Sequence, residues 1–75
     1  MKLLGPLLRA LREARGLSFE EVARRLRYRD LRKGVRRLKT VEATGQVKND
    51  LLLRLLEVLG IDLADFEDIL DRLRG

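Results

Sequence analysis

The chain of 75 residues contains no cysteine and no histidine. Without cysteine it forms no disulfide and offers no thiolate ligands to a metal. Without histidine it lacks the side chain used most often for acid–base catalysis near neutral pH. Its one serine, Ser18, is placed to cap a helix, and no glycine-rich phosphate loop is present. We therefore expect neither an enzyme nor a protein that depends on a cofactor or metal.

Long apolar runs are also absent. The leucines at the start of the chain are followed by Pro6 and Arg9, which interrupt the run before a signal peptide or a membrane span is complete. The sequence therefore predicts no association with membranes and, by default, a cytoplasmic location. With 45% hydrophobic residues the chain is not disordered, and its length predicts one small domain, residues 1–75.

Negative charge is scarce in the first two thirds of the chain. Residues 1–48 contain 14 Lys or Arg and five Asp or Glu, whereas residues 49–75 contain three and seven. Thirteen of the 17 cations are arginine, which binds phosphate and guanine through two parallel hydrogen bonds. The net charge of +5 is thus the difference between a strongly basic and an acidic segment. This distribution predicts a dipolar molecule with one cationic face that binds a polyanion.

Glycine, proline and helix-capping residues divide the chain into five helical segments, and no segment alternates as a strand does. The predicted helices cover roughly residues 6–15, 19–26, 31–42, 49–59 and 63–73. The best-defined start is at Ser18, which has the capping-box spacing to Glu21. A turn at residues 27–29 follows the second helix, and Asp30 is the predicted N-cap of the third. The fold class is therefore all-α.

Each helix has an expected inner face. On the first, Leu7, Leu8 and Leu11 line one face, and the three arginines lie elsewhere. Gly34 costs about 1 kcal/mol relative to alanine inside a helix, so the third helix is expected to start late or to be irregular there. The fourth has one narrow polar stripe and should be the most buried. On the fifth, the residues expected to face inward are Leu63, Phe66, Ile69, Leu70 and Leu73.

Three stretches resemble the lambda-repressor-like (Cro-type, XRE) family. LREARGLSFEEVARRL, residues 11–26, is similar to the first two helices of that family. VEATG, residues 41–45, resembles the end of its recognition helix, and residues 52–62 resemble its fourth helix. The similarity covers roughly residues 7–66 and implies a five-helix lambda-repressor-like domain that contains a helix-turn-helix. It also implies sequence-specific binding to duplex DNA and a role as a transcriptional regulator.

Two positions depart from the pattern of that family. Phe19 stands where the family usually has a glutamine that commonly holds a phosphate, and Arg27 stands where the turn usually opens with glycine. The stretch between Leu26 and Glu42 is also about five residues longer than is usual, so base contacts do not transfer residue by residue.

Positive charge is concentrated between residues 24 and 39. This segment contains nine Lys or Arg and one acid, Asp30. A face that only keeps a protein soluble more often alternates both signs, because crowded like charges repel one another. We therefore interpret the segment as a binding surface built on the third helix, the second helix of the helix-turn-helix.

Distance from the start of this helix divides the cations into two groups. Residues near its start approach base edges in the major groove, and the others approach phosphates. The candidates for base contacts are Arg32, Lys33, Arg36 and Arg37. The candidates for phosphate contacts are Arg24, Arg27, Tyr28, Arg29, Lys39, Thr40, Lys48 and Asn49. Tyr28 serves equally well as a packing residue.

Two alternatives use the same basic face. A protein-interaction module would dock an acidic partner of a regulatory complex, and a duplex-RNA binder would contact phosphates. Single-stranded RNA is less favoured, because the chain has only two phenylalanines and one tyrosine on which bases could stack. The expected partners are therefore duplex DNA, a regulatory protein, and a second copy of the chain paired through the fifth helix. The apolar side of that helix serves equally well to close the core.

Overall fold

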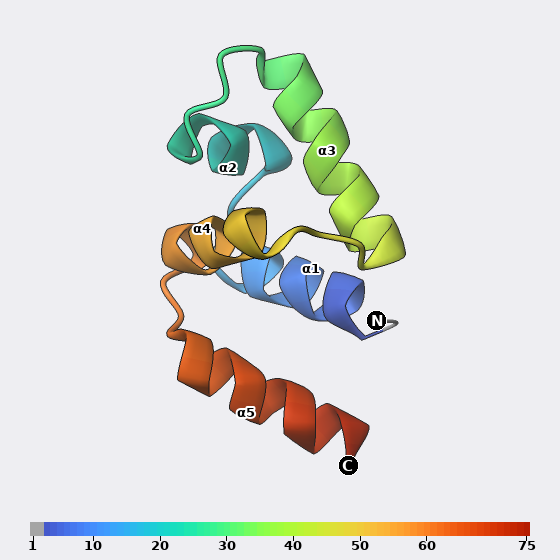
Figure 1. Ribbon diagram of the computed structural model, residues 1–75. Helices are drawn as coiled ribbons and strands as arrows, with labels where there is room; N and C mark the ends of the chain where they lie inside the picture. Colours follow the sequence, from blue (N-terminus) through green and yellow to red (C-terminus); the bar gives the residue numbers. More distant parts are fainter. Residues whose placement is uncertain (1–2) are drawn as a thin grey trace.

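Five helices joined by short turns make up residues 3–75, the part of the chain that the computed structural model describes (Figure 1). They are α1 (Leu4–Ala14), α2 (Phe19–Arg25), α3 (Leu31–Thr44), α4 (Asn49–Leu59) and α5 (Leu63–Arg74). These residues contain no strand. The predicted all-α fold is confirmed, and the helix ends lie within about two residues of their predicted positions, as expected for ends defined by local capping.

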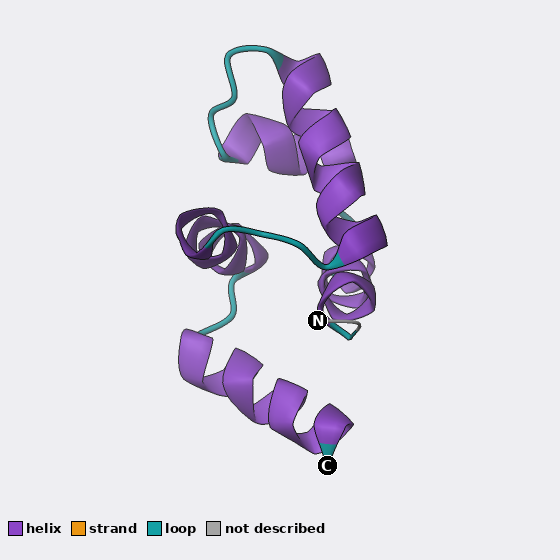
Figure 2. Cartoon of the chain, turned by 45° about the vertical axis from the view of Figure 1, so that its right-hand side comes forward, coloured by secondary structure: helices purple, strands orange, loops and turns teal. Residues whose placement is uncertain are grey.

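The helices are arranged with α2 and α3 at one end of the molecule and α5 at the other (Figure 1). Both ribbon views place α3 alongside α2 and α1, and α4 lies between α2 and α5 (Figure 2). The largest fully buried side chains, Val22, Val41, Leu59 and Phe66, come from four different helices. One core therefore joins α2, α3, α4 and α5, and Leu4 and Leu8 of α1 complete it.

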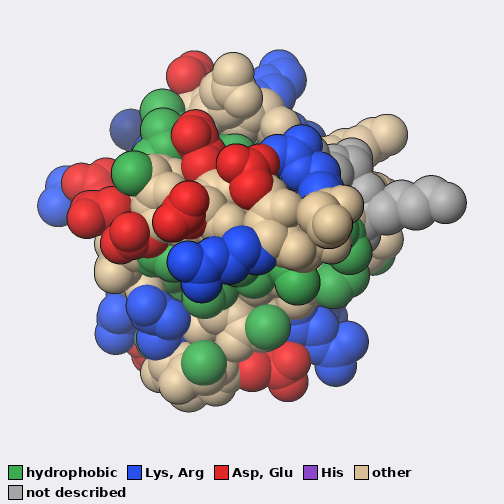
Figure 3. All heavy atoms as spheres, turned by 90° about the horizontal axis from the view of Figure 1, so that it is seen from below, with side chains coloured by type: hydrophobic (Ala, Val, Ile, Leu, Met, Phe, Trp, Pro, Cys, Tyr) green, Lys and Arg blue, Asp and Glu red, His purple; other side chains and the backbone are tan. Residues whose placement is uncertain are grey.

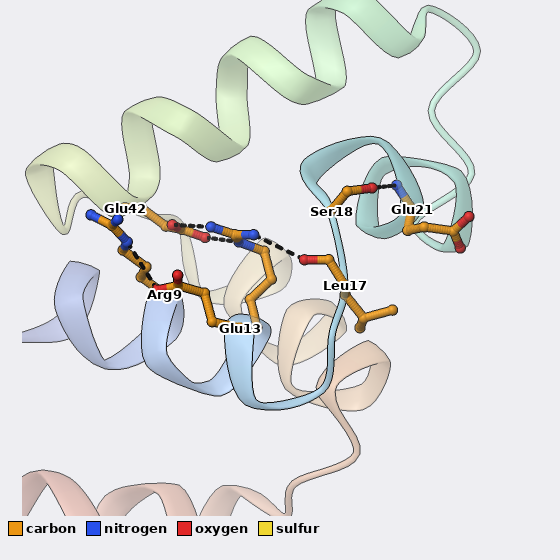
Figure 4. A network of polar contacts seen from close by, with 7 residues as sticks. Arg9, Glu13, Leu17, Ser18, Glu21 and Glu42 are labelled. Carbon is orange, nitrogen blue, oxygen red and sulfur yellow. Dashed lines mark hydrogen bonds and ion pairs between the residues drawn. The ribbon is translucent and has the colours of Figure 1, made fainter.

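The start of α2 is held by the predicted cap. The Ser18 hydroxyl accepts a hydrogen bond from the backbone N–H of Glu21 at 3.1 Å (Figure 4). The Glu21 carboxylate accepts from Arg24 at 3.2 Å instead of reaching back to the cap. Only half of the capping box therefore forms, which still satisfies one of the free N–H groups at the start of the helix.

Two expectations about α4 and α5 are wrong. In α4 three residues are buried, no more than in α1 or α3, and Leu53 is 49% exposed. In α5 the side chains of Phe66 and Leu70 are buried, but Leu63 and Leu73 are 43% and 53% exposed. The physical reason is that the neighbouring helices cover only the middle of α5, so its two ends extend beyond the core.

A partly buried ion pair joins α1 to the C-terminal half of α3. Arg12 Nε donates to Glu42 Oε2 at 2.7 Å, and Arg12 Nη2 donates to Glu42 Oε1 at 3.2 Å (Figure 4). The two side chains are only 14% and 12% exposed. The hydrogen bond to Glu42 raises the pKa of Arg12 above its usual value, although partial burial acts in the opposite direction. The sequence places Arg12 away from the leucine face of α1, and the structure shows that it packs against α3 there.

The same guanidinium also fixes the segment that leads into α2. Arg12 Nη1 donates to the backbone carbonyl of Leu17 at 2.9 Å (Figure 4). Its central carbon lies 4.0 Å from the centre of the Phe19 ring, within the range of a cation–π contact. One arginine thereby connects α1, the start of α2 and α3, and it sets the position of the helix-turn-helix on the rest of the molecule.

Candidate nucleic-acid interface

The start of α3 is defined by the predicted cap, Asp30. Its carboxylate Oδ1 accepts from the backbone N–H groups of Arg32 at 3.0 Å and Lys33 at 3.3 Å. α3 then continues without a break to Thr44, where Gly45 ends it in the left-handed conformation with φ of 71°. The irregularity expected at Gly34 is absent, because the missing side chain serves a tertiary contact.

That contact is with the turn before α3. A Cβ atom on Gly34 would lie 2.7 Å from the Tyr28 ring and 3.1 Å from Cβ of Ala23. Tyr28 is half-buried and its backbone N–H donates to the carbonyl of Ala23 at 3.2 Å. Of the two roles considered for Tyr28, packing is therefore observed. Gly34 lets α3 approach α2 closely, and this close approach fixes the orientation of α3 relative to α2.

The turn itself holds a residue in an unfavourable conformation. Arg27 has a φ of 64° and is the only residue other than glycine with a positive φ among residues 3–75. This conformation costs a side-chain-bearing residue roughly 1–2 kcal/mol. Arg54 of α4 donates a hydrogen bond to the carbonyl of the preceding residue, Leu26, which holds the turn against α4.

Arg27→Gly is therefore expected to raise the free energy of unfolding by about 0.5–1 kcal/mol, because relief of the strain exceeds the added entropy of glycine in the unfolded chain. Urea denaturation followed by circular dichroism measures the change. Arg29→Gly is the matched control, since it removes the same charge from the same turn at a position with negative φ, and it is expected to lower stability. Equal effects of the two substitutions would show that Arg27 is not strained.

The outer side of α3 carries five exposed cations. None of them forms an ion pair with any acid in residues 3–75. They are Arg32, Lys33, Arg36, Arg37 and Lys39. Asp30, the nearest acid in the sequence, is engaged with backbone N–H groups through Oδ1. The positive charge of this surface is therefore largely uncompensated.

The structure divides these cations between two hollows. Arg32, Arg36 and Lys39 line a shallow hollow that also includes Glu20 of α2. Lys33 and Arg37 line a different hollow on the side of α4. The four predicted base-contact residues therefore do not lie on one line of the helix. Spacing alone could not show this, because it does not fix where α2 and α4 lie against α3.

The predicted phosphate contacts are dispersed. Arg24 is exposed but pairs with Glu21, and Arg27 lines a hollow between α2 and α4 that includes no residue of α3. Arg29 is exposed in the turn. These three residues therefore surround the turn, and the structure does not bring them together into one cluster.

The remaining phosphate candidates lie along α3 and at the start of α4. Nζ of Lys39 is 5.9 Å from the centre of the Phe19 ring. Thr40 uses its hydroxyl hydrogen within α3, donating to the carbonyl of Arg36 at 3.0 Å. Lys48 is the N-cap residue of α4, Asn49 is its first residue, and both are exposed. Lys39 shares a hollow with Arg32 and Arg36, Thr40 shares one with Arg37, and Lys48 shares one with Lys33 and Arg37.

Arg54 is the residue of this surface that the sequence analysis missed. It lines the same hollow as Lys33 and Arg37, although it lies in α4. The available signal was that Arg54 is the one cation in a segment otherwise rich in leucine, but the pattern of one helix does not show which neighbour it faces.

Within residues 3–75 no cluster of acidic side chains has the arrangement of a metal site. No helix in that range is long and apolar enough to cross a bilayer. The family model described as a helix-turn-helix domain matches residues 3–69. Comparisons with curated proteins and with solved structures found no match.

Proposed function

We propose that this chain, which belongs to the helix-turn-helix domain family, binds duplex DNA through α3 and acts as a transcriptional regulator. The observation that carries the proposal is the group of five exposed cations on α3 that form no ion pair with an acid within residues 3–75. An α-helix fits the major groove of B-DNA, where arginine pairs with O6 and N7 of guanine. The base-contact residues in this proposal are Arg32 and Arg36, and Lys33 and Arg37 lie in a separate hollow.

The charge distribution supports this orientation on the duplex. α3 and α5 lie at opposite ends of the molecule (Figure 1). Figure 3 views the molecule from the α5 end and shows acidic side chains gathered on one side of that face. A polyanion therefore meets repulsion near α5 and attraction at α3, which orients the molecule before contact is made.

The geometry favours duplex DNA over duplex RNA. The major groove of A-form RNA is deep and narrow, so an exposed helix such as α3 does not reach the base edges in it. An acidic protein partner is less favoured because the apolar residues on the outer flank of α3, Leu31 and Val35, are already packed against the core. Protein interfaces usually depend on buried apolar or aromatic anchors, which this surface does not offer.

Fluorescence anisotropy with a labelled random-sequence duplex of about 20 base pairs tests the proposal. We expect log K to fall with log salt concentration with a slope steeper than about −3, because several phosphates are neutralised. Arg36→Ala combined with Arg37→Ala should make the slope shallower by about 1–2. Absence of binding at about 50 mM salt, where non-specific DNA binding is strong, would sink the proposal.

The chain offers a control of equal charge. Arg72→Ala combined with Arg74→Ala also removes two cations, but from the exposed end of α5. This control should leave the salt slope nearly unchanged if binding is local to α3. A loss equal to that of the α3 pair would show attraction to net charge alone. Tighter competition by duplex RNA or by an acidic peptide would favour the alternative partners.

The regulatory role leads to a prediction about sequence. Selection from a random duplex library should enrich sites with guanines at fixed spacing, since the proposed readers are arginines. Pairing of two copies through α5 stays a prediction. Its apolar side closes the core with Phe66 and Leu70, and only Leu63 and Leu73 at its ends are left exposed. A two-fold symmetric selected site would support such pairing.

A further inference from the structure

The two neighbouring arginines of α3 face different surroundings. Gly34, Leu38 and Val41 are buried and mark the side of the helix that faces the core. With about 3.6 residues per turn, Arg36 lies almost directly opposite this side, whereas Arg37 lies roughly 100° around the helix from Arg36. Arg36 therefore points outward, and Arg37 lies on the flank that faces α4.

On this flank Arg37 lines a shallow cationic hollow. The side chains that line it include Arg37 and Lys33 of α3, Lys48 at the start of α4, and Arg54 within α4. Tyr28 and Leu51 supply apolar surface, and Asp50 is the one acid. Four cations from two helices thus converge on one hollow with a single negative charge.

Two observations connect this hollow with its surroundings. Arg37 and Lys48 also line the adjoining hollow formed with Thr40, Gln46 and Val47, so the cationic surface continues along the connection between α3 and α4. Arg54 is anchored by its hydrogen bond to the carbonyl of Leu26. The wall of the hollow formed by α4 is therefore held in place by the turn that precedes α3.

We infer that the hollow between α3 and α4 is a site for a backbone phosphate of the bound duplex, and that Arg37 contacts phosphate and not a base. When a helix lies in the major groove, its outward side faces the base edges and its flanks face the sugar–phosphate walls. Arg32 and Arg36 then read bases, while Lys33, Arg37, Lys48 and Arg54 hold the strand beside them. This inference rests on the proposed binding of DNA.

Arg36→Ala and Arg37→Ala form a matched pair that separates the two roles. Each removes one exposed arginine from α3, so the change in stability should stay within about 0.5 kcal/mol, which thermal melts will verify. Arg37→Ala should weaken binding to a selected site and to a random duplex by the same factor, and reduce the salt slope by about 1. Arg36→Ala should weaken the selected site more, lowering the ratio of the two affinities. A fall in this ratio for Arg37→Ala equal to that for Arg36→Ala would overturn the inference.

A second readout works even if DNA does not bind. Tyr28 is the one tyrosine of a chain without tryptophan, so intrinsic fluorescence reports on this hollow alone. Inorganic phosphate, titrated against chloride at equal ionic strength, should change the fluorescence saturably in the wild type and not in Arg37→Ala. A saturable fluorescence change in a protein that does not bind DNA would support the phosphate site and reject only the proposed function. A response that is absent, or identical in Arg37→Ala, would reject the site.

Discussion

Glu42→Ala is expected to lower the free energy of unfolding by about 2–4 kcal/mol, a large part of the stability of a domain this small. Removing the carboxylate leaves the guanidinium of Arg12 mostly buried without its partner. The two remaining contacts of Arg12, with the carbonyl of Leu17 and the ring of Phe19, do not replace a bidentate carboxylate. Urea denaturation followed by circular dichroism gives the free energy directly.

The ion pair between Arg9 and Glu13 supplies the control. It lies on the same helix, at 3.0 Å, but its side chains are 64% and 56% exposed. Glu13→Ala should therefore change stability by no more than about 0.5 kcal/mol. A double variant, Arg12→Met with Glu42→Leu, should recover most of the lost stability, because apolar side chains fill the site without a buried charge. Similar losses for Glu42→Ala and Glu13→Ala would contradict this account.

The pH dependence of this pair follows from the raised pKa of Arg12. A cation whose pKa is higher in the folded state contributes its stabilisation fully below the unfolded value and loses it only as pH rises through the folded value. For arginine both values lie far above neutrality. Titration of Arg12 should therefore not change the contribution of the ion pair to the free energy of unfolding between weakly acidic and weakly alkaline pH.

The helices could be predicted because their signals are local. Ser18 and Asp30 each accept hydrogen bonds from N–H groups within three residues, and a single turn of chain is enough to identify such caps. The spacing of hydrophobic residues likewise predicts the inward-facing positions of Leu38 and Val41, which are buried in α3. These interactions depend on neighbours in sequence, so the sequence contains the information directly.

The contacts that position the site could not be predicted, because they join distant segments. Arg12 and Glu42 are 30 residues apart, and each alone resembles a surface charge on an amphipathic helix. One signal was present: Glu42 is the only acid between Asp30 and Asp50. Helix propensity predicts only a local cost for Gly34, whereas its role depends on the ring of Tyr28.

The expected division of the cations into base and phosphate contacts stays a prediction, and it used position in the sequence alone. Nearness to the start of α3 grouped Arg36 with Arg37, but α4 lies on one flank of that helix and places the two arginines in different surroundings. Helix packing, which spacing does not encode, thus decides which cation faces outward.

Gly5→Ala is expected to destabilise the fold by about 3 kcal/mol or more, although alanine is the better helix former by about 1 kcal/mol. A Cβ atom at Gly5 would lie 2.1 Å from the carbonyl oxygen of Glu42 and 3.3 Å from that of Val41. Both are backbone atoms of α3, so no side chain can turn aside. α1 would have to move away from α3 and lose the packing of Leu4 and Leu8.

Gly34→Ala provides the comparison, because its added Cβ meets a side chain instead of a backbone. The atoms at 2.7 Å are Cγ and Cδ2 of Tyr28, a side chain that can shift by turning about χ1 at moderate cost, so we expect a loss of only about 1–2 kcal/mol. Tyr28→Ala in the same chain should cancel most of the loss due to Gly34→Ala, whereas it should not relieve Gly5→Ala. Thermal and urea unfolding of the four variants establish the order. A gain in stability from Gly5→Ala would contradict the close approach of α1 to α3, and with it the placement of the α3 surface on which DNA binding depends.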